Sequence, residues 1–417
     1  MAKLHIRGGR RLSGEVTLQG SKNSALPILA ASLMVRGTVV LHNCPDLSDV
    51  RAAVRILNSL GCKCSQLGHD VYIDASVVKC DAVPDDLMRE MRSSVVFLGA
   101  ILSRCASATI SAPGGCELGP RPIDLHLKAI KEMGFSVNES GGYINCARES
   151  GRSKTDIILD FPSVGATENI ILAATLSKGR VVLHNAAKEP EISDLADFIN
   201  GAGGKIYGAG TDTVEIFGVN RLYSTEHTII PDRIVAATYM SAVSATGGDI
   251  TVKNTVPSHI NAIVTRYREM GCEVNFSDDD MRVVSNRRMS RITKTRSTVY
   301  PGFPTDAGPL LVTSLALAEG TSLFVETIFD NRFNYAEELK LLGADIKVFG
   351  RLAVIEGVRS LHGANVRCTD LRGGAAAVVA ALAAEGESTV DKICHIERGY
   401  ENIQNALSAL SADIKRE

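Results

Sequence analysis

A six-fold internal repeat constrains the fold of this 417-residue chain more than any other feature of its sequence. Each repeat contains an amphipathic segment, closed by an apolar residue and a small residue and followed by a strand-like segment. The closing small residues recur every 68 to 73 positions, at Gly61, Gly134, Gly203, Gly271, Gly343 and Ser411. Glycine at this place fits the left-handed cap of a helix. A fixed period of this kind predicts repeated helix–strand units.

An Ala-rich segment precedes each amphipathic one. Examples are SALPILAASLMV at 24–35 and GGAAAVVAALAA at 373–384, which are apolar on almost every side and therefore predict buried helices. Both are shorter than the ~20 residues that a membrane span needs. The first three repeats match the last three at a separation of 208 to 210 residues. We therefore predict two similar α/β domains of three repeats each, with buried helices in the middle and sheets facing outward.

The repeat also predicts the domain limits. The boundary falls before PDRIVAATYM, near residue 230, so that residues 22–229 form the first domain. The strand-like N-terminus, KLHIRGGRRLSGEVTLQG, lies outside the repeat count. We expect it to pair with the second half, so that residues 1–21 and 230–417 form the second domain.

Composition excludes several classes of function. Forty-five Lys and Arg against 47 Asp and Glu give a net charge of -2, which argues against a nucleic-acid partner. The opening MAKLHIRGGR lacks the apolar core of a secretory signal. The ten cysteines are scattered, and Cys62 and Cys64 form a C-x-C without a second pair at zinc spacing. We expect a cytoplasmic protein with free thiols, no metal, no cofactor and no membrane contact.

Charged residues stand at matched positions of the repeats. Counting back 14 residues from the small residue that closes each Ala-rich helix gives the predicted helix starts Asn23, Arg92, Gly165, Arg233, Asp306 and Arg372, with Lys22 beside the first. The loops before three amphipathic helices carry Arg121, Arg332 and Arg398. Helix starts favour anions. If the two domains face each other, these cations converge on one cleft, which would suit a doubly charged anion or two anionic substrates.

Two further residues in this pattern allow more than one interpretation. The loop PGGCELGPRP at 113–122 carries Cys116, which is either an idle loop thiol or a thiol activated by neighbouring cations. Asp306 interrupts the cationic series and is either a counter-ion of the arginines or a general base. Asp49, Asp124 and Asp194 are interpreted as acidic first-turn residues of helices. The chain has no P-loop, dinucleotide fingerprint or G-x-S-x-G elbow.

Several stretches closely resemble the bacterial UDP-N-acetylglucosamine enolpyruvyl transferases, and the likeness covers essentially the whole chain. They include LQGSKNSALPILAASL, GGCELGPRPIDLHL, FPSVGATENIILAATL, GFPTD, DNRFNYAEELKLLGADIK and HIERGYENI. The resemblance implies an inside-out α/β barrel in two domains. It also implies transfer of the enolpyruvyl group of phosphoenolpyruvate to the 3′-hydroxyl of UDP-N-acetylglucosamine, with release of phosphate. In the family this addition–elimination is the first committed step of peptidoglycan synthesis.

The resemblance also implies residue roles. Cys116 donates the proton to the methylene group, can form a phospholactoyl adduct, and is the position that fosfomycin alkylates. Asp306 takes the hydroxyl proton, and Asn23 holds the sugar hydroxyl or the intermediate. Lys22, Arg121 and Arg398 hold the phosphate of phosphoenolpyruvate, and Arg332 and Arg372 hold its carboxylate. The implied catalytic set is Cys116, Asp306, Lys22 and Arg398. The implied nucleotide-sugar site comprises Arg92, Arg121, Pro122, Ile123, Asp124, Leu125, Ser163, Val164, Gly165 and Ile328.

The sequence departs from the family pattern beside Asp306. After GFPTD the family usually continues with an apolar residue and glutamine, whereas Ala307 and Gly308 stand here. Tyr335 replaces a common histidine, Lys188 a usual arginine, and Phe161 a lysine that some members have. These changes leave open a catalytically weakened paralogue that binds nucleotide sugar. A shikimate-pathway enolpyruvyl transferase is a further alternative, although it would not need the G-G-C loop.

Overall fold

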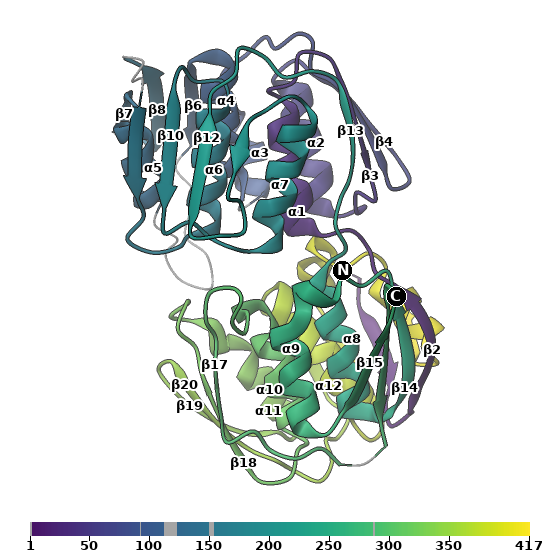
Figure 1. Ribbon diagram of the computed structural model, residues 1–417. Helices are drawn as coiled ribbons and strands as arrows, with labels where there is room; N and C mark the ends of the chain where they lie inside the picture. Colours follow the sequence, from purple (N-terminus) through teal and green to yellow (C-terminus); the bar gives the residue numbers. More distant parts are fainter. Residues whose placement is uncertain (1, 92, 112–122, 150–153, 287) are drawn as a thin grey trace. The chain divides into compact units, whose positions relative to one another are not determined.

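The computed structural model describes residues 2–91, 93–111, 123–149, 154–286 and 288–417 (Figure 1). The predictions for Arg92, Cys116, Arg121 and Pro122 fall outside these residues. The described chain forms two compact units, one running from Gly20 to Ile230 and the other combining the residues up to Gln19 with Pro231–Glu417. In the described ranges, the helices are all too short or too polar to cross a membrane.

The first unit consists of three sheets and a set of helices. Its helices are α1 (Lys22–Ser32), α2 (Ser48–Ser59), α3 (Asp85–Glu90), the 3-10 helix η1 (Ser94–Val96), α4 (Phe97–Cys105), α5 (Asp124–Glu132), α6 (Val164–Thr175) and α7 (Pro190–Gly201). Its strands are β3 (Thr38–His42), β4 (Lys63–Leu67), β5 (Asp70–Asp74), β6 (Ser107–Ser111), β7 (Phe135–Ser140), β8 (Tyr143–Arg148), β9 (Lys154–Ile158), β10 (Arg180–His184), β11 (Ile206–Tyr207), β12 (Thr213–Phe217) and β13 (Thr225–Thr228). The sheet orders are β13-β3-β5-β4, β6-β8-β7 and β11-β12-β10-β9.

The second unit has the same design. Its helices are α8 (Arg233–Thr246), α9 (Pro257–Met270), η2 (Thr305–Ala307), α10 (Gly308–Leu315), η3 (Arg332–Tyr335), α11 (Ala336–Leu341), α12 (Leu371–Ala383), η4 (Ile393–Arg398) and α13 (Ile403–Ala409). Its strands are β1 (Leu4–Arg7), β2 (Leu12–Thr17), β14 (Gly248–Lys253), β15 (Glu273–Ser277), β16 (Asp280–Ser285), β17 (Lys294–Arg296), β18 (Thr321–Val325), β19 (Asp345–Phe349), β20 (Leu352–Glu356), β21 (Asn365–Arg367), β22 (Glu387–Asp391) and β23 (Asp413–Arg416). The sheet orders are β21-β22-β1-β23, β15-β16-β14-β2 and β17-β18-β20-β19.

The Ala-rich helices form the interior of each unit. In the second unit α8, α10 and α12 contact one another and lie between the sheet with β14 and β15 and the sheet with β18 to β20 (Figure 1). In the first unit α4 packs closely on α6 because Gly99 has no side chain. A Cβ at Gly99 would lie 2.4 Å from the carbonyl oxygen of Asn169, whose Oδ1 accepts the Gly99 N–H at 2.7 Å. The prediction of buried helices inside outward-facing sheets is therefore confirmed.

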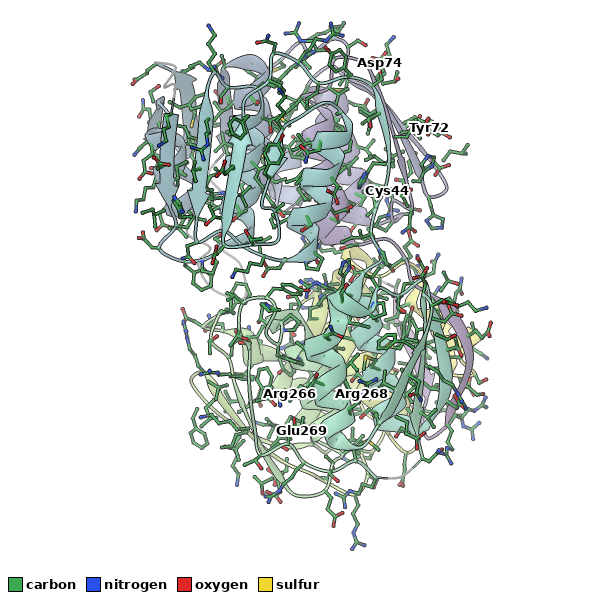
Figure 2. The ribbon with its side chains drawn as sticks, in the orientation of Figure 1. Cys44, Tyr72, Asp74, Arg266, Arg268 and Glu269 are labelled. Atoms are coloured by element: carbon green, nitrogen blue, oxygen red, sulfur yellow. The ribbon has the colours of Figure 1, made fainter. Side chains whose placement is uncertain are left out.

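The amphipathic helices cover this interior. On α9 the buried residues are Ile260, Ile263, Val264, Tyr267 and Met270, at helical spacing. The same helix carries charged side chains, among them Arg266 and Glu269, which pair at 2.5 Å (Figure 2). The six small residues that close these helices have φ between 69° and 105°, so the predicted left-handed caps are confirmed.

Both ends of the chain belong to the second unit. Strand β1 pairs with β22 and β23, and β2 runs parallel to β14. Asp49 and Asp124 stand in the first turns of α2 and α5, as predicted. The interpretation of Asp194 as a helix start is wrong, because Pro190 at the first helical position begins α7 one turn earlier.

Candidate active site

Three of the predicted site residues of the second unit meet in one ion-pair cluster. Arg332 donates through Nη2 to Oδ1 of Asp306 at 2.9 Å, and Arg372 donates through Nε to Oδ2 at 3.3 Å. The two arginine side chains are 3% exposed, whereas the Asp306 side chain is 31% exposed. The cluster therefore presents a carboxylate to its open side and keeps two buried cations behind it.

The start of α12 positions Arg372. Asp370 caps this helix, and its Oδ1 accepts from the backbone N–H groups of Arg372 at 3.0 Å and Gly373 at 3.1 Å. The guanidinium also donates through Nη1 to the hydroxyl of Tyr400 at 3.2 Å. Burial by itself lowers the pKa of Arg372, but Tyr400 and Asp306 outweigh it and leave the pKa above its usual value. Arg372 is thus a permanent cation fixed from three directions.

A second set of contacts positions Arg332 in η3. Its Nη2 also donates to the carbonyl of Thr305 at 3.3 Å, and its Nη1 lies 4.0 Å from Oδ1 of Asp370. The guanidinium carbon is 5.7 Å from the centre of the Phe329 ring. The buried Nε of Arg332 has no hydrogen-bond partner among the described residues. This cation therefore has capacity for a further acceptor.

Arg398 and Ile328 lie on segments that adjoin the cluster. Arg398 is half-buried at the end of η4, two residues before Tyr400. The N–H of Ile328 donates to Oε1 of Glu326 at 2.7 Å. The hydroxyl of Tyr400, which accepts from Arg372, is also 2.8 Å from that of Thr238. The second unit thus holds four predicted arginine and aspartate residues on connected segments.

In the first unit the predicted phosphate ligand Lys22 is the first residue of α1. Its Nζ lies 2.6 Å from Oδ2 of Asp49, and the two side chains are 10% and 2% exposed. Asp49 thus does more than occupy the first turn of α2, because it also neutralises a buried ammonium group. Asn23 follows on α1 and is half-buried.

The predicted nucleotide-sugar residues of the first unit lie at the starts of α5 and α6. Ser163 caps α6 by accepting the N–H of Ala166 at 3.3 Å, and Val164 and Gly165 form its first turn. A Cβ at Gly165 would lie 3.1 Å from the imidazole of His126 on α5, so the two helix starts touch at this glycine. Ile123, Asp124 and Leu125 form the beginning of α5, before His126.

His126 is a buried residue that the sequence analysis did not single out. Its Nδ1 is 2.9 Å from Nδ2 of Asn169, and burial lowers its pKa to about 4. The imidazole is therefore neutral at physiological pH and accepts from the amide. It joins the helix starts that carry Ile123 to Leu125 and Ser163 to Gly165.

One of the two departures beside Asp306, Gly308, has a packing explanation. A Cβ at Gly308 would lie 3.0 Å from the ring of Phe324, so glycine leaves the space that this buried ring fills. Phe324 in turn packs edge-on against Phe303 and Phe333, at 6.1 and 6.2 Å. Tyr335 is 1% exposed, and its hydroxyl has no hydrogen-bond partner among the described residues. An aromatic cluster thus supports the turn that carries Asp306.

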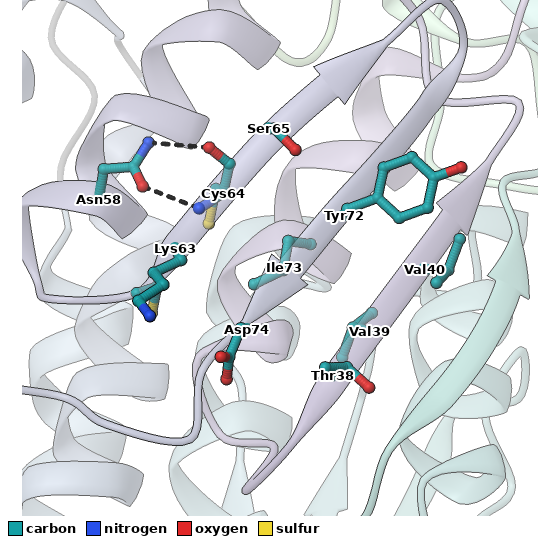
Figure 3. A pocket seen from close by; sticks show the side chains of 11 residues that line it. Thr38, Val39, Val40, Asn58, Lys63, Cys64, Ser65, Tyr72, Ile73 and Asp74 are labelled. Carbon is teal, nitrogen blue, oxygen red and sulfur yellow. Dashed lines mark hydrogen bonds between the residues drawn. The ribbon is translucent and has the colours of Figure 1, made fainter.

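A hollow of about 400 Å³ lies at the sheet that contains β3, β4 and β5 (Figure 3). Its lining includes Asn58, Cys62, Cys64, Tyr72 and Asp74, and none of the predicted site residues. Asn58 holds the backbone of Cys64 by two hydrogen bonds, at 2.9 and 3.3 Å. The neighbouring Cys64 thiol is the main cause of a lowered pKa at Cys62. The hollow has no anion-binding residue in common with the cluster.

Two units of buried helices inside outward-facing sheets define a two-domain α/β protein, and a cation stands in the first turn of α1, α8 and α12, namely Lys22, Arg233 and Arg372. The sequence matches the family model for EPSP synthase (3-phosphoshikimate 1-carboxyvinyltransferase) over residues 6–407, and the chain therefore belongs to this family of enolpyruvyl transferases.

Within the family, the relatives are more specific. The chain is 51% identical to UDP-N-acetylglucosamine 1-carboxyvinyltransferase 2 of Caldanaerobacter subterraneus subsp. tengcongensis, over 100% of both chains. It is 45% identical to UDP-N-acetylglucosamine 1-carboxyvinyltransferase 1 of Symbiobacterium thermophilum, over 99% of this chain and 94% of that one. The crystal structure of the enolpyruvyl transferase NikO from Streptomyces tendae superposes with a TM-score of 0.90 at 25% identity, covering 100% of this chain and 98% of that one. The family resemblance and the two-domain α/β fold predicted from the sequence are confirmed.

Proposed function

We propose that this chain transfers the enolpyruvyl group of phosphoenolpyruvate to the 3′-hydroxyl of UDP-N-acetylglucosamine and releases phosphate, as the first committed step of peptidoglycan synthesis. The main support is the name UDP-N-acetylglucosamine 1-carboxyvinyltransferase, which relatives of 45–51% identity over nearly the whole chain carry. The contacts of Asp306 with two buried arginines are the structural observation that suits this chemistry best. The family model carries the name of the shikimate-pathway enzyme, but the relatives of 45–51% identity favour neither that alternative nor the paralogue.

In the proposed reaction Asp306 accepts the proton of the sugar hydroxyl. Arg332 and Arg372 stabilise the charged form of the Asp306 carboxylate, which makes it a weaker proton acceptor. The carboxylate of phosphoenolpyruvate would bind the same two guanidinium groups and weaken their bonds to Asp306. The base would thus gain strength only when the second substrate is present. Counter-ion and general base, the two interpretations of Asp306, then describe the same residue before and after the substrate binds.

The phosphate group of phosphoenolpyruvate would bind Lys22, Arg121 and Arg398. Lys22 is suited to this role because the carboxylate of Asp49 stabilises the positive charge of the Lys22 ammonium group in a buried site. The half-buried Arg398 stands two residues before Tyr400, whose hydroxyl accepts from Arg372. In the same proposal Asn23 holds the reacting sugar hydroxyl. Metal ions and cofactors have no part in this scheme, because fixed cations carry the charge.

The nucleotide sugar would bind along the starts of α5 and α6. The helix starts contribute Ile123, Asp124, Leu125, Ser163, Val164 and Gly165, and the predicted site further includes Arg92, Arg121, Pro122 and Ile328 from other positions in the chain. The first N–H groups of a helix have no acceptor within it, so the start of α6 at Val164 is suited to diphosphate oxygens. Since both substrates are phosphorylated metabolites, we place the reaction in the cytoplasm.

Cys116 would donate the proton to the methylene carbon of phosphoenolpyruvate. A thiol near cations ionises readily and reacts with electrophiles. We therefore expect fosfomycin to label Cys116: the sulfur atom bonds to a carbon of the epoxide, the C–O bond at that carbon breaks, and the oxygen takes up a proton to become a hydroxyl group. The Cys116→Ser variant should lose this labelling and much of its turnover. Labelling that persists in the variant would remove Cys116 from the proposal.

Mass spectrometry of the acceptor tests the proposed reaction. After incubation with phosphoenolpyruvate and the purified chain, UDP-N-acetylglucosamine should become heavier by one enolpyruvyl group, and shikimate 3-phosphate should not. Asp306→Ala should abolish the product but retain nucleotide-sugar binding. The matched control is Asp249→Ala, which removes a carboxylate from an exposed pair with Arg282 and should leave the product unchanged. Bound but unmodified nucleotide sugar in the wild-type reaction would identify a catalytically weakened paralogue instead.

A further inference from the structure

Glu326 is a buried carboxylate directly after strand β18, and the proposed reaction gives it no role. It is 1% exposed, and no arginine, lysine or histidine forms a salt bridge with it in the described parts of the chain. Burying a charged group without a cation is costly, so its hydrogen bonds must compensate. Four donors supply them, which fills the acceptor sites of a carboxylate.

The first oxygen of Glu326 holds the turn that leads to Arg332. Its Oε1 accepts from the N–H of Ile328 at 2.7 Å and from that of Phe329 at 3.2 Å. The hydroxyl of Ser297 donates to the same oxygen at 2.9 Å. Strands β17 and β18 are parallel neighbours, and their last residues, Arg296 and Val325, lie opposite each other. Ser297 and Glu326 are the next residues of the two strands and therefore lie side by side. This oxygen therefore fixes the turn against the sheet.

The second oxygen holds the residue before Asp306. Oε2 accepts from the hydroxyl of Thr305 at 2.9 Å, and the carbonyl of Thr305 accepts from Arg332 at 3.3 Å. Thr305 begins the short helix η2, which contains Asp306. The carboxylate thus holds both partners of the ion pair between Asp306 and Arg332, through the residue before Asp306 and through the turn before Arg332.

We propose that Glu326 is a positioning residue of this site, which sets the place of the Asp306 carboxylate relative to Arg332 through Thr305 on one side and the turn at Ile328 and Phe329 on the other. This inference rests on the proposed function only for its kinetic consequence. Misplacing a reacting group by about 1 Å costs roughly 100-fold in rate. We call the hydrogen bonds of Glu326 with Thr305, Ile328 and Phe329 the brace. Loss of the contacts of one Glu326 oxygen should therefore lower kcat by at least about tenfold.

Thr305 allows the brace to be cut on the Asp306 side alone. Thr305→Val keeps the shape but removes the hydroxyl, whereas Thr305→Ser keeps the hydroxyl. We expect kcat to fall at least about tenfold in Thr305→Val, with the KM for UDP-N-acetylglucosamine within about twofold of wild type, and Thr305→Ser to restore most of kcat. Thr313→Val is the matched control, since its buried hydroxyl donates to the carbonyl of Pro309 within α10. It should leave kcat unchanged.

Glu326 itself gives the second arm. Glu326→Gln retains one carbonyl oxygen for the two N–H groups, and its amide can donate to Thr305 if that hydroxyl turns. We expect a smaller loss of kcat in Glu326→Gln than in Glu326→Ala. In the double variant Glu326→Gln/Thr305→Val the losses should be non-additive, because both act through one contact. Equal kcat in wild type and Thr305→Val, or additive losses, would overturn the positioning role.

A crystallographic readout separates this inference from the proposed reaction. The distance from Arg332 Nη2 to Asp306 Oδ1, 2.9 Å in the wild type, should lengthen in Thr305→Val and be retained in Thr305→Ser. If wild type fails to turn over these substrates but the distance changes as expected, the proposed function is wrong and the brace stands. An unchanged distance in Thr305→Val refutes the brace whether or not the enzyme is active.

Discussion

Replacing Asp370 by alanine tests how the fold holds its two buried arginines. The loss of the α12 cap, which serves two N–H groups, costs about 1 kcal/mol. The attraction to Arg332 at 4.0 Å is worth up to about 4 kcal/mol at an effective dielectric constant of about 20. Arg332 keeps its shorter contact with Asp306, and removing Asp370 also removes its own desolvation cost. We therefore assign about 1–2 kcal/mol to the pair of Asp370 with Arg332. Together with the lost cap, Asp370→Ala should lower the free energy of unfolding by about 2–3 kcal/mol.

Urea unfolding measures this cost, and the KM for phosphoenolpyruvate measures its effect on the site. Asp370→Asn should recover about 1 kcal/mol, since its amide oxygen still caps α12, but the KM should stay raised because the charge is lost. Asp232→Ala removes a comparable cap, because Asp232 Oδ1 accepts from Ile234 at 2.8 Å and Val235 at 3.1 Å on α8. It is a control for the stability cost of a cap only, since Asp232 also helps to raise the pKa of Arg372. If Asp370→Ala costs less than about 0.5 kcal/mol and leaves the KM unchanged, the reasoning is refuted.

Three further predictions concern other buried polar groups. Asp49→Asn removes the carboxylate beside Lys22 and should cost about 2–4 kcal/mol in urea unfolding and raise the KM for phosphoenolpyruvate; an unchanged KM would contradict the role of Lys22. Because burial lowers the pKa of His126 to about 4, the unfolded chain binds the extra proton first, so stability should fall as pH drops from about 6.5 towards 4, by up to about 3 kcal/mol. Thermal unfolding of His126→Gln should show a shallower pH dependence, and an equal slope would refute this assignment. Tyr335→Phe removes a buried hydroxyl without a partner in the described chain and should raise the unfolding free energy by up to about 1 kcal/mol; a lower melting temperature would count against it.

The repeat made the helices and their caps predictable from the sequence. The signals are local: an apolar run sets a buried helix, and the small residue that closes an amphipathic helix takes positive φ, as at Gly61 and Ser411. The same count placed Lys22 and Arg372 within the first turns of α1 and α12. Side chains at such starts follow from the backbone pattern alone.

The partners of these cations could not be predicted in the same way. Asp306 meets Arg332 and Arg372 across 26 and 66 residues, and only the folded chain brings them together. The sequence left Asp306 either a counter-ion or a base, and the structure adds that it pairs with both arginines. The sequence did contain a signal for the helix caps. Asp232 stands one residue before Arg233 and Asp370 two residues before Arg372, and both aspartates cap the helix that follows.

Glu326 and His126 escaped the sequence analysis for a physical reason. Each lies beside or within an apolar stretch, where a polar residue has no periodic or motif signal. Their importance comes from tertiary hydrogen bonds to Thr305 and Asn169, which no local pattern encodes. Predictions that fall on Arg92, Cys116, Arg121 and Pro122 lie outside the described residues and stay predictions.

Release of phosphate from phosphoenolpyruvate is the most direct test of the central claim. The purified chain should release phosphate when UDP-N-acetylglucosamine is present, and should release none with phosphoenolpyruvate alone or with shikimate 3-phosphate as acceptor. No release with the nucleotide sugar, although calorimetry shows that it binds, would contradict the proposed transferase activity and leave a protein that only binds nucleotide sugar.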